Sequence, residues 1–457
     1  MIRASLSELA VALDARLTGE AVIAGLATDT RTLQGGELFV ALRGPNFDGH
    51  DFLDIALQTG AAAVLAERAP SSGAALVVRD SRHALGVLAR YWRRRMAPQM
   101  VAVTGSNGKT TVKQMLASIL SCAGSTLATE GNLNNDIGVP LTLARLSPEH
   151  RYAVIEMGAN HAGEIAWLGE LAEPNVAVVT NAGPAHLEGF RSLEGVARAK
   201  GELFQLLGPD GVAVINADDP FAPLWYGLAE NRRVMDFGTS RTARVNADGV
   251  DADSRVAIRT PAGSCQVTLP VPGRHNLMNA LAATAAAVAV GIPLAHVRTG
   301  LEAFRPVGGR LQMARSAEGA LIINDTYNAN PASLSAGVDV LIEQAQGAGQ
   351  QPPCKPWLVL GDMAELGVEA EVLHAEAGRL ARERGVQRLY TLGSVSEAAS
   401  RAFGAGASHF TDREVLIAAL REDLRGDVAV LVKGSRSMGM EAVVASLMAS
   451  ASASGGH

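Results

Sequence analysis

The chain is poor in cysteine and in aromatic residues. Its three cysteines, Cys122, Cys265 and Cys354, lie far apart and show no metal-ligand spacing, which indicates reduced thiols of a cytosolic protein rather than a disulfide framework or a zinc site. Aromatic residues are 4% of the chain, whereas hydrophobic residues together are 48%. Its cores must therefore be built mainly from closely packed alanine, valine and leucine.

An excess of positive charge and a long apolar segment are also lacking. The formal net charge of −6 argues against nucleic acid or an anionic membrane as the main partner. The N-terminus carries acids early and has no apolar region followed by a cleavage site. The longest apolar run, 281–295, is rich in alanine, is too short to cross a bilayer and predicts a buried helix. We therefore expect a soluble, cytoplasmic monomer that contacts neither nucleic acid nor the membrane interior.

The length of 457 residues predicts about three domains at ~150 residues each. Alternating strand and helix patterns indicate an α/β fold throughout. The first unit opens with an amphipathic helix over 6–17. We expect a small N-terminal α/β module over 1–82, a central P-loop mononucleotide-binding doubly wound parallel sheet over 83–306, and a C-terminal Rossmann-like α/β domain over 307–457.

Apolar strands that end abruptly in polar or glycine residues recur in the second and third units. Helical segments separate these strands, which is typical of parallel sheets with helices on both faces. The segment 237–271 is rich in threonine and valine and interrupted by turns, which indicates an antiparallel excursion. The repeated strand ends lie at 152–158, 176–183 and 211–219 in the second unit, and at 320–331, 357–367, 388–393 and 428–436 in the third.

A glycine-rich turn between a strand and a helix dominates the second unit. In V-A-V-T-G-S-N-G-K-T-T (101–111), Gly105 and Gly108 let successive N–H groups point at one anion, and the helix N-terminus adds its partial positive charge. Lys109 would reach the β- and γ-phosphates and Thr110 a magnesium ion. Val103 stands where the usual motif has glycine, so this is a shortened phosphate loop. The alternative is an ordinary turn with a surface lysine. The expected ATP contacts are Thr104, Gly105, Ser106, Asn107, Gly108, Lys109, Thr110 and Thr111.

Polar residues at the following strand ends extend this site. Glu156 comes directly after apolar strand residues, where a phosphate-loop fold places an acid that holds magnesium. His186 follows the next strand and is a second candidate ligand, although a lone histidine is more often structural or exposed. Asn181 and Asp218 lie at ends of the same sheet. Because carboxyl ends of parallel strands share one edge, these residues predict a ligand site there.

Five further residues are weaker candidates for the site when only the local sequence pattern is considered. Lys200 has the pattern of a solvated helix lysine. Asn276 and Asn279 are three residues apart and share a helix face, which would either contact the base or cap the helix. Arg310 could clamp a phosphate from the junction of two units. Asp325, at a strand end, could accept a hydrogen bond from a ribose hydroxyl.

Several motifs taken together resemble one family. T-G-S-N-G-K-T-T, E-M-G, N-A-G-P-A-H-L-E, A-K-G-E-L-F, G-R-H-N-x-x-N-A-L-A-A and K-G-S-R-x-x-x-M-E are similar to the Mur ligases of peptidoglycan synthesis, in order and over nearly the whole chain. The stretches 131–143, 325–333 and 360–367 resemble the branch that joins D-alanyl-D-alanine to UDP-N-acetylmuramoyl-tripeptide. The D-N-P-R motif of the branch that adds diaminopimelate is absent.

The resemblance implies an ATP-dependent ligase that forms an acyl phosphate and then an amide. It implies two Mg²⁺ ions, held by Thr110, Glu156, His186 and a carbamylated Lys200. Carbamylation needs a neutral amine, so the pKa of Lys200 would have to fall well below ~10.4. The catalytic residues implied are Lys109, Lys200, His186 and Arg310, while Asn276, Asn279, Arg310 and Asp325 would complete the ATP site.

The resemblance also implies two substrate-binding regions. Residues of the first unit would hold the uridine diphosphate end, and Asn135 would approach the sugar–peptide part. The first-unit residues are Asp29, Thr30, Arg31, Gly44, Asp48, Gly49 and His50, and the third-unit candidates are Asn328, Asn330, Asp362, Glu365, Lys433 and Ser435.

Two other functions compete with this reading. A phosphate-loop regulatory switch would hydrolyse nucleotide without any amine acceptor. A folylpolyglutamate synthase would share the central domain, but the N-terminal T-D-T-R and D-G-H segments argue against it.

Overall fold

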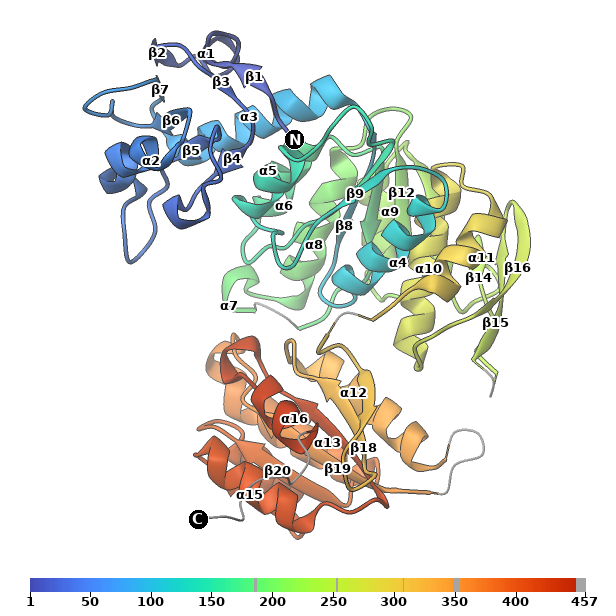
Figure 1. Cartoon of the computed structure of the whole chain (residues 1–457). Coiled ribbons are helices and arrows are strands. Elements are labelled where there is room, and N and C mark those ends of the chain that lie inside the picture. Colours follow the sequence, from blue (N-terminus) through green and yellow to red (C-terminus); the bar gives the residue numbers. More distant parts are fainter. Residues whose placement is uncertain (185–186, 252–253, 307, 348–352, 449–457) are drawn as a thin grey trace.

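The computed structural model describes residues 1–184, 187–251, 254–306, 308–347 and 353–448, and it contains three large sheets in succession along the chain. Figure 1 shows the first two units joined by the long helix α3 (Ser81–Met96), with the third unit below them. Most neighbouring strands in each sheet are parallel. The predicted α/β fold class is therefore confirmed.

The first sheet has the order β2-β7-β6-β5-β4, and only β2 runs antiparallel to its neighbour. A two-stranded pair of β1 and β3 lies beside it. The elements are β1 (Ala4–Ser5), α1 (Leu6–Leu13), β2 (Arg16–Thr18), β3 (Val22–Ile23), β4 (Leu26–Ala27), η1 (Thr30–Thr32), β5 (Leu38–Val40), η2 (Gly49–Phe52), α2 (Leu53–Thr59), β6 (Ala63–Ala66) and β7 (Ala75–Val77).

The predicted first helix is wrong at its C-terminal end. Helix α1 stops at Leu13 because Asp14 adopts the left-handed conformation, with φ 50° and ψ 43°, and its N–H caps the helix. Aspartate tolerates this conformation better than most residues. Leu17 has the spacing of a helix face, but it pairs with Leu76 of β7 instead. Backbone pairing with a distant strand therefore overrides the local helical period.

The second sheet has nine strands in the order β16-β15-β14-β13-β12-β11-β8-β10-β9. The last two strands in sequence, β15 and β16, are antiparallel, which confirms the predicted excursion. The strands are β8 (Gln99–Thr104), β9 (Thr126–Ala128), β10 (Tyr152–Glu156), β11 (Val176–Val179), β12 (Val212–Asn216), β13 (Arg233–Gly238), β14 (Val245–Asn246), β15 (Arg255–Thr260) and β16 (Gly263–Thr268).

Alternation along the central strand β8 separates the two faces of this sheet. Val101 and Val103 pack into the layer of α4, α10 and α11, whereas Met100 and Ala102 pack into the opposite layer. That opposite layer is continuous with the core of the first unit and with α3, so the two units share one hydrophobic core. The helices are α4 (Lys109–Ser121), α5 (Gly138–Leu143), α6 (Glu164–Ala172), α7 (Leu187–Phe190), α8 (Leu193–Gln205), α9 (Ala222–Ala229), α10 (Arg274–Ala289) and α11 (Leu294–Ala303).

The third sheet has the order β17-β18-β22-β19-β20-β21, with only β17 antiparallel. Helices α12, α13 and α14 cover one face, and α15 and α16 cover the other. The elements are β17 (Gln312–Arg315), β18 (Leu321–Asp325), α12 (Pro331–Ala345), β19 (Lys355–Gly361), η3 (Gly367–Glu369), α13 (Ala370–Glu383), β20 (Arg388–Leu392), α14 (Glu397–Phe403), β21 (Ala407–Phe410), α15 (Arg413–Asp423), β22 (Val428–Lys433), η4 (Arg436–Met438) and α16 (Glu441–Met448).

The alanine-rich run that was predicted to be a buried helix lies mostly in α10, where Leu281 and its neighbours are fully covered. Among the described residues, none of the helices combines the length and the apolarity that a bilayer crossing requires.

Candidate active site

A cavity of about 1100 Å³ opens where the carboxyl ends of the second sheet face the third unit. Its wall includes the glycine-rich loop, Glu156, the first turns of α10 and the segment between β18 and α12. Arg82 of α3 lies at its rim. All three sequence units therefore contribute side chains to one cleft.

The glycine-rich loop is closely packed against its neighbours. Gly105 and Gly108 have φ values of +143° and +81°, which L side chains rarely adopt. A methyl group on Gly105 would lie 1.9 Å from the Thr180 hydroxyl, and one on Gly108 would lie 2.3 Å from the Asn279 side-chain oxygen. Glycine is therefore required at both positions by conformation and by space.

Hydrogen bonds from the next strand hold this loop open. The Asn107 N–H donates to Asn181 Oδ1 at 2.9 Å, and the Thr180 hydroxyl donates to the Asn107 carbonyl at 2.6 Å. Lys109 Nζ bends back over the loop and donates to the carbonyls of Gly105 (2.7 Å) and Ser106 (3.2 Å). Burial lowers the pKa of Lys109. The loop thus forms a preorganised cradle with a lysine across it.

Glu156, at the end of β10, stands directly beside the first turn of α4. Its Oε1 accepts hydrogen bonds from the Thr110 hydroxyl (3.1 Å) and from Asn134 Nδ2 (2.8 Å). Its Oε2 is buried without a hydrogen-bond partner, although Lys113 Nζ lies 3.7 Å away. A buried carboxylate oxygen with an open coordination position is costly unless a ligand completes it.

The donor set around Glu156 fits Mg²⁺. Oxygen ligands from one carboxylate and one hydroxyl, completed by water and phosphate oxygens, are what this ion prefers. Among the described residues, no three His, Cys, Asp or Glu side chains gather as a self-sufficient metal site. A magnesium ion held by Thr110 and Glu156 would have water and phosphate oxygens available as further ligands.

Lys200 is buried on α8, so the pattern-based expectation of a solvated lysine is wrong. The residue is 2% exposed, and among the described residues the contacts of Nζ are the Ala159 carbonyl at 3.5 Å and the face of Phe190 at 5.3 Å. Burial, and secondarily the charge of Lys109, lowers the pKa of Lys200 to about 7. A large share of the amine is therefore neutral near pH 7, as carbamylation requires.

Replacing Lys200 with methionine is expected to stabilise the fold at pH 7. The pKa of this amine is about 7 in the folded chain and ~10.4 when unfolded. Between these values the unfolded chain binds more protons, so wild-type stability rises with pH. The urea midpoint of K200M should exceed that of the wild type at pH 7, and this gain should shrink toward pH 10.

The buffer for this comparison should be free of CO2, so that the amine stays unmodified. K355M is the matched control, because Lys355 is exposed and paired with Asp427 at 2.8 Å. Equal midpoints for wild type and K200M at pH 7 would contradict the buried, uncompensated amine.

The third unit reaches the phosphate loop through two side chains. Arg310 Nη2 donates to the Thr110 hydroxyl at 2.9 Å, and its guanidinium lies 4.0 Å from the ring centre of Tyr327. Asn330 Nδ2 donates to Asn107 Oδ1 at 2.9 Å. Asn330 also caps α12 through the Ser333 N–H. The cleft therefore holds an arginine from one unit against the phosphate loop of another.

A partly buried ion pair supports the third-unit wall. Lys433 Nζ lies 2.5 Å from Asp325 Oδ2 and donates to the Asn328 carbonyl at 2.9 Å. Asp325 also accepts from the Leu311 N–H at 3.3 Å. All three site candidates line the cavity, but they are already bonded to one another.

The two asparagines of α10 lie in the cavity wall, but only Asn279 contacts the glycine-rich loop. Asn279 packs on Gly108 and donates to Asn276 Oδ1 at 3.3 Å. Asn276 donates to the Pro272 carbonyl at 2.7 Å, at the start of the helix. Both are buried in the cavity wall.

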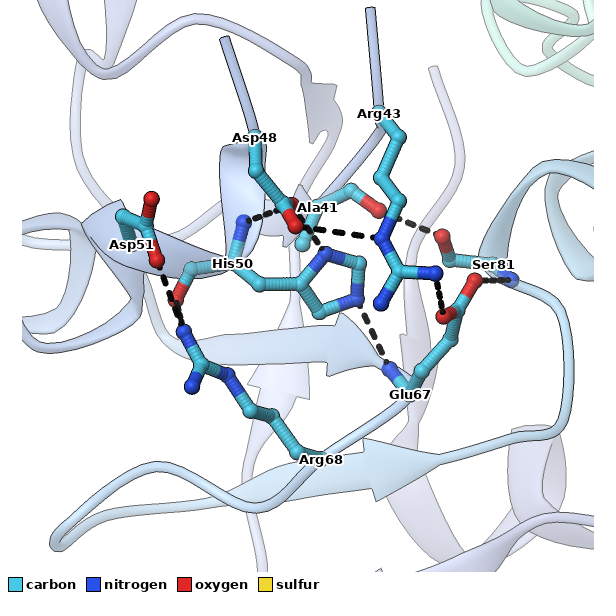
Figure 2. A network of polar contacts seen from close by, with 8 residues as sticks. All are labelled: Ala41, Arg43, Asp48, His50, Asp51, Glu67, Arg68 and Ser81. Carbon is cyan, nitrogen blue, oxygen red and sulfur yellow. Dashed lines mark hydrogen bonds and ion pairs between the residues drawn. The ribbon is translucent and has the colours of Figure 1, made fainter.

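The candidate residues of the first unit lie outside this cavity. His50 is 3% exposed and sits between Asp48 (Nδ1–Oδ1 2.6 Å) and the Glu67 N–H, which donates to Nε2 at 3.0 Å (Figure 2). Gly49 has no room for a Cβ, which would approach the Leu42 backbone to 2.7 Å. His50 and Gly49 therefore shape the turn and do not offer free groups, while Gly44 packs near Phe47.

Asp29, Thr30 and Arg31 form an exposed turn nearby. Asp29 accepts the Arg31 N–H at 2.9 Å and pairs with its guanidinium, which lowers the pKa of Asp29 to about 2. Asn135 does line the cavity, and its Oδ1 accepts from the Gly138 N–H at 2.8 Å.

The remaining third-unit candidates either line the cavity or support the loops behind it. Glu365 lines the cavity, whereas Asp362 and Ser435 do not. Asp362 accepts backbone N–H groups of Ser394, Val395 and Ser396, and the Ser435 hydroxyl accepts the Ala364 N–H at 2.7 Å. These bonds favour positioning roles for Asp362 and Ser435. His186 lies outside the described residues.

Several cavity residues had no sequence prediction. They include Arg82, which pairs with Asp136. Lys113 also had no prediction, and it lies behind the cavity wall, fully buried beside Glu156. One signal could have pointed to Lys113: the chain has only five lysines against 35 arginines. Four of the five, Lys109, Lys113, Lys200 and Lys433, lie in or directly behind the cleft. Asn134, His275 and Tyr327 lie within motifs that resemble the family but had no role assigned to them, and Trp167 lies in none of those motifs.

Comparison with known proteins gives consistent matches. Residues 22–120 match the model described as Mur ligase family, catalytic domain, residues 103–287 the Mur ligase middle domain, and residues 309–436 the Mur ligase, glutamate ligase domain. The UDP-N-acetylmuramoyl-tripeptide–D-alanyl-D-alanine ligase of Escherichia coli K12 is 45% identical, over 98% of this chain and 99% of that protein.

Solved structures agree with these matches. A crystal structure of MurF from Acinetobacter baumannii superimposes with a TM-score of 0.91 at 36% identity, covering 98% of this chain and 99% of that one. MurF ligase from Thermotoga maritima in complex with ADP gives 0.82 at 28% identity, covering 93% and 97%.

Proposed function

This chain belongs to the Mur ligase family, and from that premise we propose how its cleft joins D-alanyl-D-alanine to UDP-N-acetylmuramoyl-tripeptide with ATP. The product is a precursor of peptidoglycan, made in the cytoplasm, and so serves cell shape and division. One observation carries the mechanism: Thr110 of the phosphate loop bonds both Glu156 and Arg310, the latter from the third unit.

The reaction needs an activated carboxyl group. Attack of an amine on a free carboxylate would have to expel oxide, so the carboxylate oxygen first attacks the γ-phosphorus and ADP leaves. The amine of D-alanyl-D-alanine then attacks the acyl phosphate carbonyl, and the tetrahedral intermediate releases inorganic phosphate and leaves an amide. The energetic task of the first step is to bring one anion against another.

Lys109 and Arg310 would offset that repulsion. Both have nitrogen atoms within hydrogen-bond distance of phosphate-loop atoms, and fixed cations aimed at a transferring phosphoryl group stabilise its developing charge. Arg310 is held on Tyr327, so its position is largely set before substrate arrives. Because acyl phosphates hydrolyse, the contacts between the second and third units would also exclude water.

Thr110, Glu156, His186 and a carbamylated Lys200 are proposed to hold two Mg²⁺ ions, which would supply further neutralisation of phosphate charge. The unpartnered Glu156 Oε2 supports the first site. The low pKa of the buried Lys200 amine supports carbamylation, which would convert an uncompensated cation into an anion.

The three units are proposed to divide the substrates as the sequence predicts, over 1–82, 83–306 and 307–457. The exposed turn at 29–31 and the turn at 44–50 would hold the uridine diphosphate end, and Asn135 the sugar–peptide part. Asn276, Asn279 and Asp325 would surround the nucleoside. Asn328, Asn330, Glu365 and Lys433 would face the reacting carboxyl group and the dipeptide, and we propose that one monomer suffices because one chain supplies all of them.

Phosphate release is expected to depend on both organic substrates. With UDP-N-acetylmuramoyl-tripeptide and ATP, steady-state phosphate release should rise at least tenfold when D-alanyl-D-alanine is added, since the acyl phosphate is protected from water. A coupled phosphate assay with each component omitted in turn measures this. Steady release without any amine would indicate a nucleotide-hydrolysing switch, and acceptance of a folate with glutamate would indicate folylpolyglutamate synthesis.

A further inference from the structure

Buried polar atoms without a hydrogen-bond partner are uncommon, and one that lines a cleft is a candidate contact for a ligand. Three side chains that line the cleft carry such atoms. The proposed function uses two of them, Glu156 for metal and Arg310 for phosphate. It gives no role to the third, His275, whose Nε2 is buried and unpartnered. Among the described residues, the six such atoms are Glu156 Oε2, His275 Nε2, Thr284 Oγ1, His296 Nδ1, Arg310 Nε and Ser396 Oγ.

His275 is held between the second and third units. It lies in the first turn of α10, and a methyl group on Gly273 would meet both His275 Cε1 (2.7 Å) and Val340 Cγ2 of α12 (2.8 Å). The charges that act on its ring are those of Asp325 and Lys433, from the third unit. The imidazole therefore lies in the cleft wall, next to residues of the third unit.

The position of His275 relative to the phosphate loop indicates which part of a nucleotide it meets. Asn279, one turn later on α10, packs directly on Gly108. Four residues of helix correspond to a rise of ~6 Å, which is comparable to the span from the β-phosphate of a nucleotide to its ribose hydroxyls. His275 is therefore about one helical turn from the phosphate loop, a separation that suits the ribose better than the phosphates.

The chemistry of the ring suits a hydroxyl partner. Burial lowers the pKa of His275 to about 4, so near pH 7 the ring is neutral and has one donor and one acceptor nitrogen, and a hydroxyl can satisfy either. Asp325, the other candidate for the ribose, already bonds Lys433 and the Leu311 N–H. Resting on the proposed function, we propose that His275 Nε2 hydrogen-bonds a ribose hydroxyl of the bound nucleotide and makes the enzyme selective for ribonucleotides.

Calorimetric binding of ADP, 2′-deoxy-ADP and 3′-deoxy-ADP to the full chain tests this. The wild type should bind ADP about tenfold more tightly than at least one deoxy analogue, because the analogue leaves a buried group unpaired. H275A should lose about tenfold in ADP affinity and bind that analogue as well as it binds ADP. H275Q, which keeps a donor and an acceptor, should retain part of the selectivity.

H296A is the matched control, since His296 of α11 also has an unpartnered buried nitrogen but does not line the cleft. Its affinities for all three nucleotides should equal those of the wild type. If H275A keeps the wild-type ratio of ADP to deoxy-ADP affinity while the wild type still makes amide, the proposed role of His275 is wrong. The proposed ligase function would then still stand. A wild-type chain that binds no ADP would overturn the proposed function itself.

Discussion

Replacing Lys109 with alanine is expected to abolish ATP-dependent amide formation, with a loss in kcat/KM of about 10³-fold or more. Lys109 Nζ lies over the phosphate loop, 2.7 Å from the Gly105 carbonyl. The transferred phosphoryl group would lie at this loop, and its negative charge is what Lys109 would stabilise. Loss of a single fixed donor to such a charge typically costs about 10²–10³-fold, and Lys109 is both donor and cation. Amide formation measured by separation of the product is the readout.

Two controls separate this role from a merely structural one. K355A removes the exposed lysine that pairs with Asp427, and it should keep wild-type turnover. The unfolding midpoint of K109A should not fall below that of the wild type, because among the described residues Lys109 bonds carbonyls of its own loop and burial lowers its pKa. Retained turnover in a folded K109A would remove the phosphate loop from the mechanism.

Replacing Lys200 with alanine is expected to reduce turnover at least 100-fold, and formate or acetate should restore part of it. The wild-type residue would act as a carbamate, so a short carboxylate that enters the space left by the side chain replaces the missing negative charge. The burial of Lys200 and its sparse contacts leave room for such an anion once the side chain is gone. Turnover against carboxylate concentration measures the rescue.

K109A provides the matched control for this rescue, because added carboxylate cannot replace a cation and should not restore its activity. K200A with full activity would mean that the lysine has no chemical role. The stability measurement on K200M adds a distinct signature: removal of the amine should make the fold more stable at pH 7 while catalysis is lost. A structural lysine would show the opposite sign.

The distribution of lysine explains why both expected effects are large. The exposed cationic side chains of the chain are almost entirely arginines, and Lys355 is the exposed lysine. Arginine stays protonated at physiological pH, whereas a buried lysine can lose its proton. Lysine is therefore placed where a compact charge or a neutral amine is needed, as at Lys109 and Lys200.

The sequence by itself determined the local features of this protein. The phosphate loop is predicted from two glycines and a lysine within five residues, and Glu156 from the abrupt end of an apolar strand. The turn and the strand end lie where the sequence predicts them, because a turn that needs positive φ and a strand that needs apolar faces depend on neighbouring residues. Phosphate and metal binding there stay predictions. The family follows from the order of such motifs along the chain.

Only the tertiary structure decided which distant side chains meet. Arg310 bonds Thr110 from 200 residues away, Asn330 bonds Asn107 across 223, and Lys200 becomes buried behind Ala159. No spacing encodes these contacts, because they arise from packing between units. The end of α1 at Leu13 has the same cause, since pairing with β7 outweighed a local helical period. Side-chain burial and pKa are properties of that packing, which is why the pattern around Lys200 predicted a solvated residue.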